Sequence, residues 1–88
     1  MFINKTSDGR NNICGINLAK RRKEKRLSQR EIADRLQLIG LNVDKNAIQR
    51  IECGKRFVTD IELVAISKVL ELSIEELVRA PKEESDML

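Results

Sequence analysis

Four polar side chains in the middle of the chain have the types and spacing that can hydrogen-bond to DNA base edges. They are Lys45, Asn46, Gln49 and Arg50. Lys and Arg donate to guanine O6 and N7, and Asn and Gln pair with adenine N6 and N7. The apolar residues between them, Ala47, Ile48 and Ile51, would face inward if this segment is a helix. The pattern predicts a helix over residues 45–52 that presents a polar face to the major groove.

Basic residues continue after this segment. Lys55 and Arg56 follow Gly54 in a predicted loop, where cations are well placed to contact phosphates. Support for catalysis is weak, because the sequence has no His, only two Cys, and no visible pairing of a nucleophile with a base or phosphate-binding loop. We therefore expect no enzymatic activity, no metal and no cofactor.

The charge is divided unevenly along the 88 residues. There are 8 basic and 2 acidic groups in residues 1–26, 6 and 4 in residues 27–56, and 3 and 8 in residues 57–88. This suggests a basic surface that faces a polyanion and an acidic part that faces away. The same charge distribution is equally compatible with charged helix faces that are simply exposed to solvent.

Capping signals divide the chain into short helices. Three capping boxes, in which Ser or Thr is followed three residues later by Glu, begin at Ser28, Thr59 and Ser73. Asp44 caps the segment at 45–52. The predicted helices are residues 14–26, 28–39, 45–52, 59–70 and 73–78. With low Gly and Pro content, they predict an all-α, compact five-helix bundle.

The predicted domain spans residues 13–79, between a flexible tail at 1–12 and a flexible acidic tail at 80–88. The apolar stripes predict the core residues of each helix. They are Cys14 and Leu18, then Ile32, Ala33, Leu36 and Ile39, then Ala47, Ile48 and Ile51, then Ile61, Val64, Ala65, Val69 and Leu70, and finally Leu77 and Val78.

Several short pieces in order resemble the phage repressor and Cro-type helix-turn-helix domain, also called the xenobiotic response element family. The resemblance covers residues 18–77 and is carried by Arg22, Lys23-Glu24-Lys25, Leu27-Ser28-Gln29, Glu31-Ile32-Ala33, Ile48-Gln49-Arg50-Ile51-Glu52, Gly54-Lys55 and Leu72-Ser73-Ile74-Glu75-Glu76-Leu77. It implies a lambda-repressor-like fold, in which helices 28–39 and 45–52 form the helix-turn-helix.

The same resemblance implies a sequence-specific regulator of transcription that binds double-stranded DNA. Residues 45–52 would read the major groove, and Gln29 would contact a phosphate. Arg22 and Glu52 would form a structural ion pair between the first and third helices.

Two features depart from the family pattern. Residues 37–43 make the joint between the second and third helices longer than a usual turn, and we expect Leu38 and Leu41 to cover the core there. Phe57 is expected to plug the core beneath its loop. The alternatives are an exposed apolar patch for the two leucines and a partner contact for Phe57. The basic run at residues 20–26 fits either a solvated face or additional phosphate contacts.

Other partners follow less directly from the sequence. We expect a homodimer through the fourth and fifth helices, with Leu72, Leu77 and Val78 at the contact, because one such domain covers one half-site.

The alternative function is a protein-interaction module on the same fold, such as an antitoxin or an adaptor of the transcription machinery. No membrane segment or small-molecule site is evident, and Cys14 and Cys53 are compatible with a reducing cytoplasm.

Overall fold

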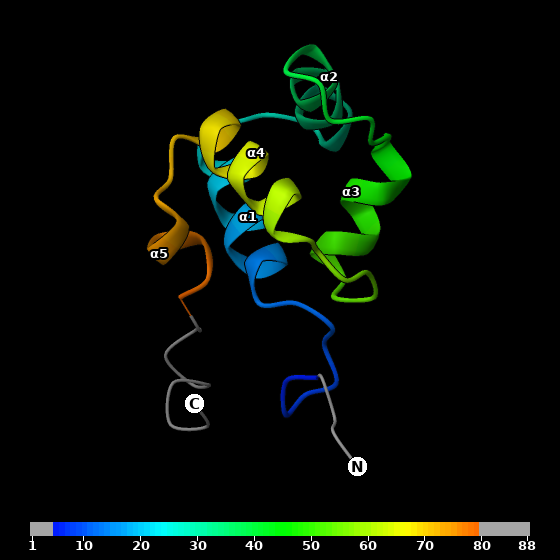
Figure 1. Cartoon of the computed structure of the whole chain (residues 1–88), viewed down its shortest axis with the longest axis vertical. Helices are drawn as coiled ribbons and strands as arrows, with labels where there is room; N and C mark the ends of the chain where they lie inside the picture. Colours follow the sequence, from blue (N-terminus) through cyan, green and yellow to red (C-terminus); the bar gives the residue numbers. More distant parts are fainter. Residues whose placement is uncertain (1–4, 80–88) are drawn as a thin grey trace.

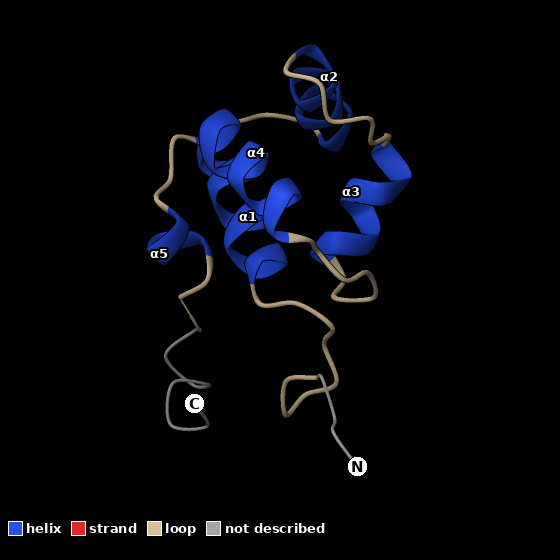
Figure 2. Cartoon of the chain, in the orientation of Figure 1, coloured by secondary structure: helices blue, strands red, loops and turns tan. Residues whose placement is uncertain are grey.

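The computed structural model describes residues 5–79, which contain five helices and no strand (Figure 1, Figure 2). The helices are α1 (Cys14–Glu24), α2 (Gln29–Leu38), α3 (Lys45–Glu52), α4 (Asp60–Leu70) and α5 (Ile74–Leu77). The all-α prediction is confirmed, and each helix begins and ends within two residues of the bounds predicted from the sequence. The predicted acidic tail at 80–88 and the first four residues lie outside the described range. None of the helices in residues 5–79 is long and apolar enough to cross a membrane.

Side chains cap four of the helices where the sequence predicts them. At α2 the Ser28 hydroxyl accepts from the Glu31 amide at 3.0 Å, and the Glu31 carboxylate accepts from the Ser28 amide at 2.8 Å. This hydrogen bond lowers the pKa of Glu31. Thr59 with Glu62 and Ser73 with Glu76 form the same kind of capping box at α4 and α5. The Asp44 side chain caps α3. Each cap satisfies amides that a helix start would leave without partners.

The core lies where the five helices meet: α1 and α4 are central, with α2 and α3 on one side and α5 on the other (Figure 1). Its buried members are Cys14, Leu18, Ile32, Ala33, Leu36, Val43, Ala47, Ile48, Ile51, Ile66, Leu70 and Leu77. Apart from Val43 and Ile66, the sequence predicts all of these. Leu63, Ala65, Val69 and Leu72 pack against the cluster from its edge.

Four predicted core residues are exposed: Ile39, Ile61, Val64 and Val78. On α4 the buried residues are Ile66 and Leu70, and Leu63, one turn before Ile66, packs beside them at the helical spacing of three and four. Ile61 is therefore 74% exposed while Ile66 is 1% exposed. Ile39 is the C-cap of α2, one position beyond its last residue, and is 51% exposed.

The longer joint between α2 and α3 is a tight helix end followed by a short connection. Gly40 has a φ of +97°, its amide donates to Gln37 O at 3.0 Å, and the Leu41 amide donates to Leu36 O at 2.9 Å. These two bonds form a Schellman motif, which needs a left-handed residue such as Gly. The motif turns Leu41 onto the core, as predicted.

Two other predictions at loops are wrong. Leu38 is 85% exposed, because it lies on the solvent side of the last turn of α2. Phe57 is 53% exposed and does not plug the core. In both cases neighbouring residues fill the interior instead: Val43 and Leu41 at the joint, and Val58 beside Phe57.

Gly15 allows α1 to approach the end of α3 closely. A Cβ atom at this position would stand 2.0 Å from the Ile51 carbonyl oxygen, which is backbone and cannot rotate away. The first turn of α1 and the last turn of α3 are therefore packed at a distance that only Gly permits.

We predict that Gly15→Ala destabilises the fold by about 1–3 kcal/mol through overpacking, although Ala favours a helix over Gly by up to about 1 kcal/mol. Urea unfolding measures the change. Lys20→Ala, on the exposed side of the same helix, is the control and should shift the free energy of unfolding by less than about 0.5 kcal/mol. A Gly15→Ala variant as stable as the control would contradict the close approach.

Candidate nucleic-acid interface

Helix α3 has one buried face and one exposed face. Ala47, Ile48 and Ile51 are buried in the core. The four side chains predicted to read bases are all exposed on the other face: Lys45, Asn46, Gln49 and Arg50. Residues separated by three or four positions are neighbours on a helix, so these donors and acceptors form one polar surface. The structure thus brings together the residues that the sequence grouped.

A hydrogen-bonded network fixes the orientation of α3. Arg22 of α1 donates to the Glu52 carboxylate through Nε at 2.7 Å and through Nη2 at 3.0 Å. Its Nη1 donates to Leu27 O at 2.8 Å. The side chains of Arg22 and Glu52 are 13% and 9% exposed, and the carboxylate raises the pKa of the guanidinium. The predicted ion pair is present, and every polar atom that it buries has a partner.

Gln29, at the start of α2, joins the same network. Its Nε2 donates to Glu52 Oε1 at 2.9 Å, so Glu52 links α3 to α2 as well as to α1. The sequence did not predict this bond. One hydrogen of the Gln29 amide is used by it, and the contact of Gln29 with a phosphate stays a prediction.

The loop after α3 separates its two basic residues. Lys55 is exposed, and its amide donates to Arg50 O at 2.9 Å. Arg56 instead forms a bidentate ion pair with Glu62, at 3.0 Å from Nη1 to Oε1 and 2.8 Å from Nη2 to Oε2. The pair raises the pKa of Arg56, and it lowers that of Glu62 through the hydrogen bond from Arg56.

Arg56 is paired within the protein, and its contact with a phosphate stays a prediction. Its Nη1 also donates to Phe57 O, so both terminal nitrogens are used within the protein. The pairing attaches the loop to the first turn of α4 and leaves Lys55 as the outward cation of the loop.

The basic run at residues 20–26 is partly used inside the fold. Besides Arg22, Arg21 donates to Leu70 O at 3.1 Å, and Lys25 pairs with Glu71. These contacts favour a structural role for part of the run. Lys20, Lys23 and Arg26 are exposed.

Sequence reasoning missed a group of polar residues before α1. Arg10, Asn11 and Asn12 hydrogen-bond to the end of α3 and its loop, although the sequence predicts a flexible tail there. The residue types alone do not indicate these contacts, because Asn and Arg are also common in unstructured segments. The partners lie about 40 residues away in the chain, with separations of 39 to 44.

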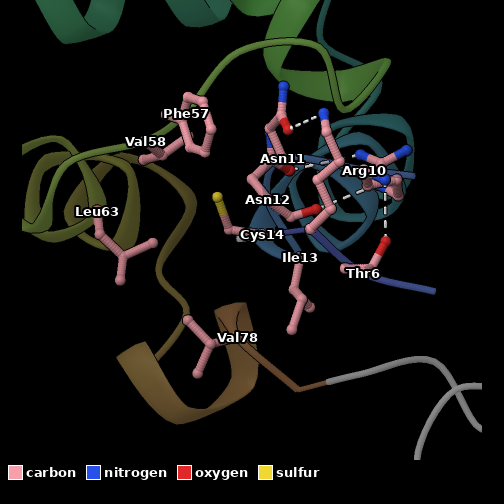
Figure 3. Close-up of a pocket in the computed structure, with 11 residues that line it drawn as sticks. Thr6, Arg10, Asn11, Asn12, Ile13, Cys14, Phe57, Val58, Leu63 and Val78 are labelled. Atoms are coloured by element: carbon pink, nitrogen blue, oxygen red, sulfur yellow. Dashed lines mark hydrogen bonds between the residues drawn. The ribbon is translucent and has the colours of Figure 1, made fainter. Parts of the chain in front are cut away.

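These residues border a cavity of about 400 Å³ (Figure 3). Arg10 and Asn12 lie on one side, with Leu63 and Val78 on the other. Cys14 also lines the cavity, and burial raises the pKa of its thiol to about 11. The thiol is therefore protonated at neutral pH and behaves as a small apolar side chain.

Comparison with known proteins agrees with this geometry. The helix-turn-helix family model matches residues 18–77. The fold is similar to the P22 c2 repressor protein, solved in complex with synthetic operator 9T in the presence of Tl+, with a TM-score of 0.66 and 23% identity over 80% of this chain and 98% of that one. It is also similar to the restriction-modification controller protein C.AhdI from Aeromonas hydrophila, with a TM-score of 0.63 and 25% identity over 73% of this chain and 86% of that one. No curated protein sequence matches the chain.

We predict that Glu52→Gln lowers the free energy of unfolding by about 2–4 kcal/mol, because it leaves Arg22 without its opposite charge in a largely buried site. Thermal or urea unfolding measures the loss. Glu24→Gln is the control: its pair with Arg21 is long, at 3.6 Å, and exposed. It should cost less than about 1 kcal/mol. Equal effects of the two changes would argue against the network as the anchor of α3.

Proposed function

Because the chain belongs to the helix-turn-helix family, we propose that it is a sequence-specific regulator of transcription that binds double-stranded DNA, with α3 in the major groove. The observation that carries the proposal is the division of α3 into two faces. Its apolar face holds the helix in the core, and its polar face is exposed. The similar P22 c2 repressor was solved with a synthetic operator, which supports the same kind of partner here.

Each part of the surface has a distinct role in this proposal. Lys45, Asn46, Gln49 and Arg50 hydrogen-bond to base edges and supply specificity. Lys55 contacts a phosphate, and Gln29 contacts another through the amide hydrogen that does not bind Glu52. Arg56 holds the Lys55 loop against α4 through its pair with Glu62.

We predict that Arg50→Ala and Asn46→Ala each weaken binding to the preferred site by about 1–3 kcal/mol and relax the preference at one base position. Lys55→Ala should weaken binding to all sequences alike and reduce the slope of log K against log salt by about 1. The preferred site is first selected from a random pool of oligonucleotides, and affinities are then measured by fluorescence anisotropy at several salt concentrations.

Lys68→Ala is the matched control for Lys55→Ala, since Lys68 is an exposed lysine on α4. It should leave the salt slope unchanged, because α4 is not placed against DNA in this proposal. A selection that enriches no sequence, together with binding that does not depend on salt, would refute the proposed function.

We further propose that the protein binds DNA as a homodimer through α4 and α5, because one domain of this size covers one half-site. Of the three contact residues expected from the sequence, only Val78 is exposed. Leu77 is fully buried and Leu72 packs on the core, so neither is available. The exposed apolar residues on these two packed helices are Ile61 and Val64 of α4 and Ile74 of α5, with Val78 at its end.

We predict that Ile61→Glu converts the dimer to a monomer at tens of micromolar, because it buries a charge at the apolar contact. Sedimentation velocity gives the mass. Leu38→Glu, an even more exposed apolar position on α2, is the control and should stay dimeric. If the unchanged chain is monomeric both free and on DNA, the homodimer proposal is refuted.

A further inference from the structure

Three side chains that precede α1 bind the backbone at the far end of α3. We call residues 10–12 the N-terminal latch. The bonds are Arg10 Nη2 to Glu52 O at 2.9 Å, Asn11 Nδ2 to Lys55 O at 2.9 Å, and Asn12 Nδ2 to Ile51 O at 3.0 Å and to Arg56 O at 2.7 Å. The Asn11 amide adds a bond to Gly54 O at 2.7 Å.

The latch gives a partner to the last carbonyl of α3, Glu52 O, and adds a second donor to Ile51 O. The last carbonyls of a helix have no partner within the helix, and they carry its negative dipole end. Turn bonds use Gln49 O, Arg50 O and Ile51 O, while Glu52 O accepts from Arg10. The cationic guanidinium stands where a helix C-terminus favours positive charge.

The latch is itself held to α1. Asn12 Oδ1 accepts from the Gly15 amide at 2.9 Å, and Arg10 Nε donates to Asn12 O at 3.2 Å. The start of α1 and the end of α3 are thus joined through one short segment, at the close approach that Gly15 permits.

The carbonyls held by the latch belong to residues 51–56. This stretch starts directly after Arg50, a proposed base reader, and contains Lys55, a proposed phosphate contact. Groups that recognise a ligand by hydrogen bonds must be held within about 0.5 Å of the productive position. An eight-residue helix is too short to hold its own end in place without tertiary contacts.

We propose that residues 10–12 are positioning residues for DNA recognition, which set the end of α3 and the Lys55 loop without reading bases themselves. The segment lies outside the family match, which begins at residue 18. The inference rests on the proposed function, because it concerns how the same surface is held for DNA.

The test compares Asn12→Ala with Asn17→Ala in the whole chain. Asn17 is a matched control, since its Nδ2 also donates to two backbone carbonyls, Leu77 O at 2.7 Å and Arg79 O at 2.8 Å, but at α5. Both changes remove two side-chain donor bonds of the same kind, and Asn12→Ala also removes the oxygen that accepts from the Gly15 amide and from Arg10 Nη2. Asn12→Asp is added because it keeps the acceptor for the Gly15 amide and removes the donors to α3.

We predict that Asn12→Ala and Asn12→Asp weaken binding to the selected site by about tenfold or more. They should also lower the salt slope by about 0.9, the value of one lost phosphate contact. Asn17→Ala should stay within about threefold of the unchanged chain, with its salt slope intact, once sedimentation velocity shows that it dimerises as the unchanged chain does, because Asn17 holds the end of α5. All affinities are measured at a temperature where circular dichroism shows each variant folded. Asn11→Ala, which removes a single side-chain donor, replaces Asn12→Ala if that variant does not fold.

A second measurement does not need DNA. The amides of Cys53, Gly54 and Lys55 are bonded to carbonyls of α3, and their hydrogen exchange should become faster in Asn12→Ala but not in Asn17→Ala. If Asn12→Ala matches Asn17→Ala in exchange and in affinity while Arg50→Ala loses binding, the latch is refuted and the proposed function stands. If the unchanged chain binds no DNA, the proposed function fails, and the role of the latch in recognition fails with it.

Discussion

The Glu52 carboxylate is the constraint on which the arrangement of α3 depends. Helix α3 has eight residues, and a helix of that length is marginal unless tertiary contacts hold it. Glu52 is its last residue, and its side chain accepts from Arg22 of α1 and Gln29 of α2. One side chain therefore sets the position of α3 relative to both neighbours. An apolar contact would hold the helix to the core but would leave its rotation about that contact less defined.

The features that the sequence predicts well are local ones. A capping box depends on residues three positions apart, so Ser28, Thr59 and Ser73 could be placed without any tertiary information. The two faces of α3 follow from helical spacing in the same way. The pair of Arg22 and Glu52 is 30 residues apart in sequence, and it was predicted only because the chain resembles a known family.

What the sequence could not predict depends on packing between elements. On α4, Ile61 and Ile66 are equally apolar, and only the position of the helix against α1 and α2 decides that Ile66 is buried and Ile61 is exposed. The latch at residues 10–12 joins parts of the chain about 40 residues apart, so no local pattern reports it. The pair of Arg56 with Glu62 was not predicted, because Glu62 already has a local role in the capping box of α4.

The uneven charge of the chain has a structural explanation in these pairs. Glu62 and Glu71, from the acidic part of the chain, pair with Arg56 and Lys25 from the basic part. Among residues 5–79, the ion pairs do not include Lys45, Arg50 or Lys55. The acidic helices therefore neutralise cations away from the exposed face of α3 and leave the cations on that face and its loop uncompensated. The surface proposed to meet DNA therefore keeps positive charge that no ion pair offsets, although the net charge of the whole chain is only +3.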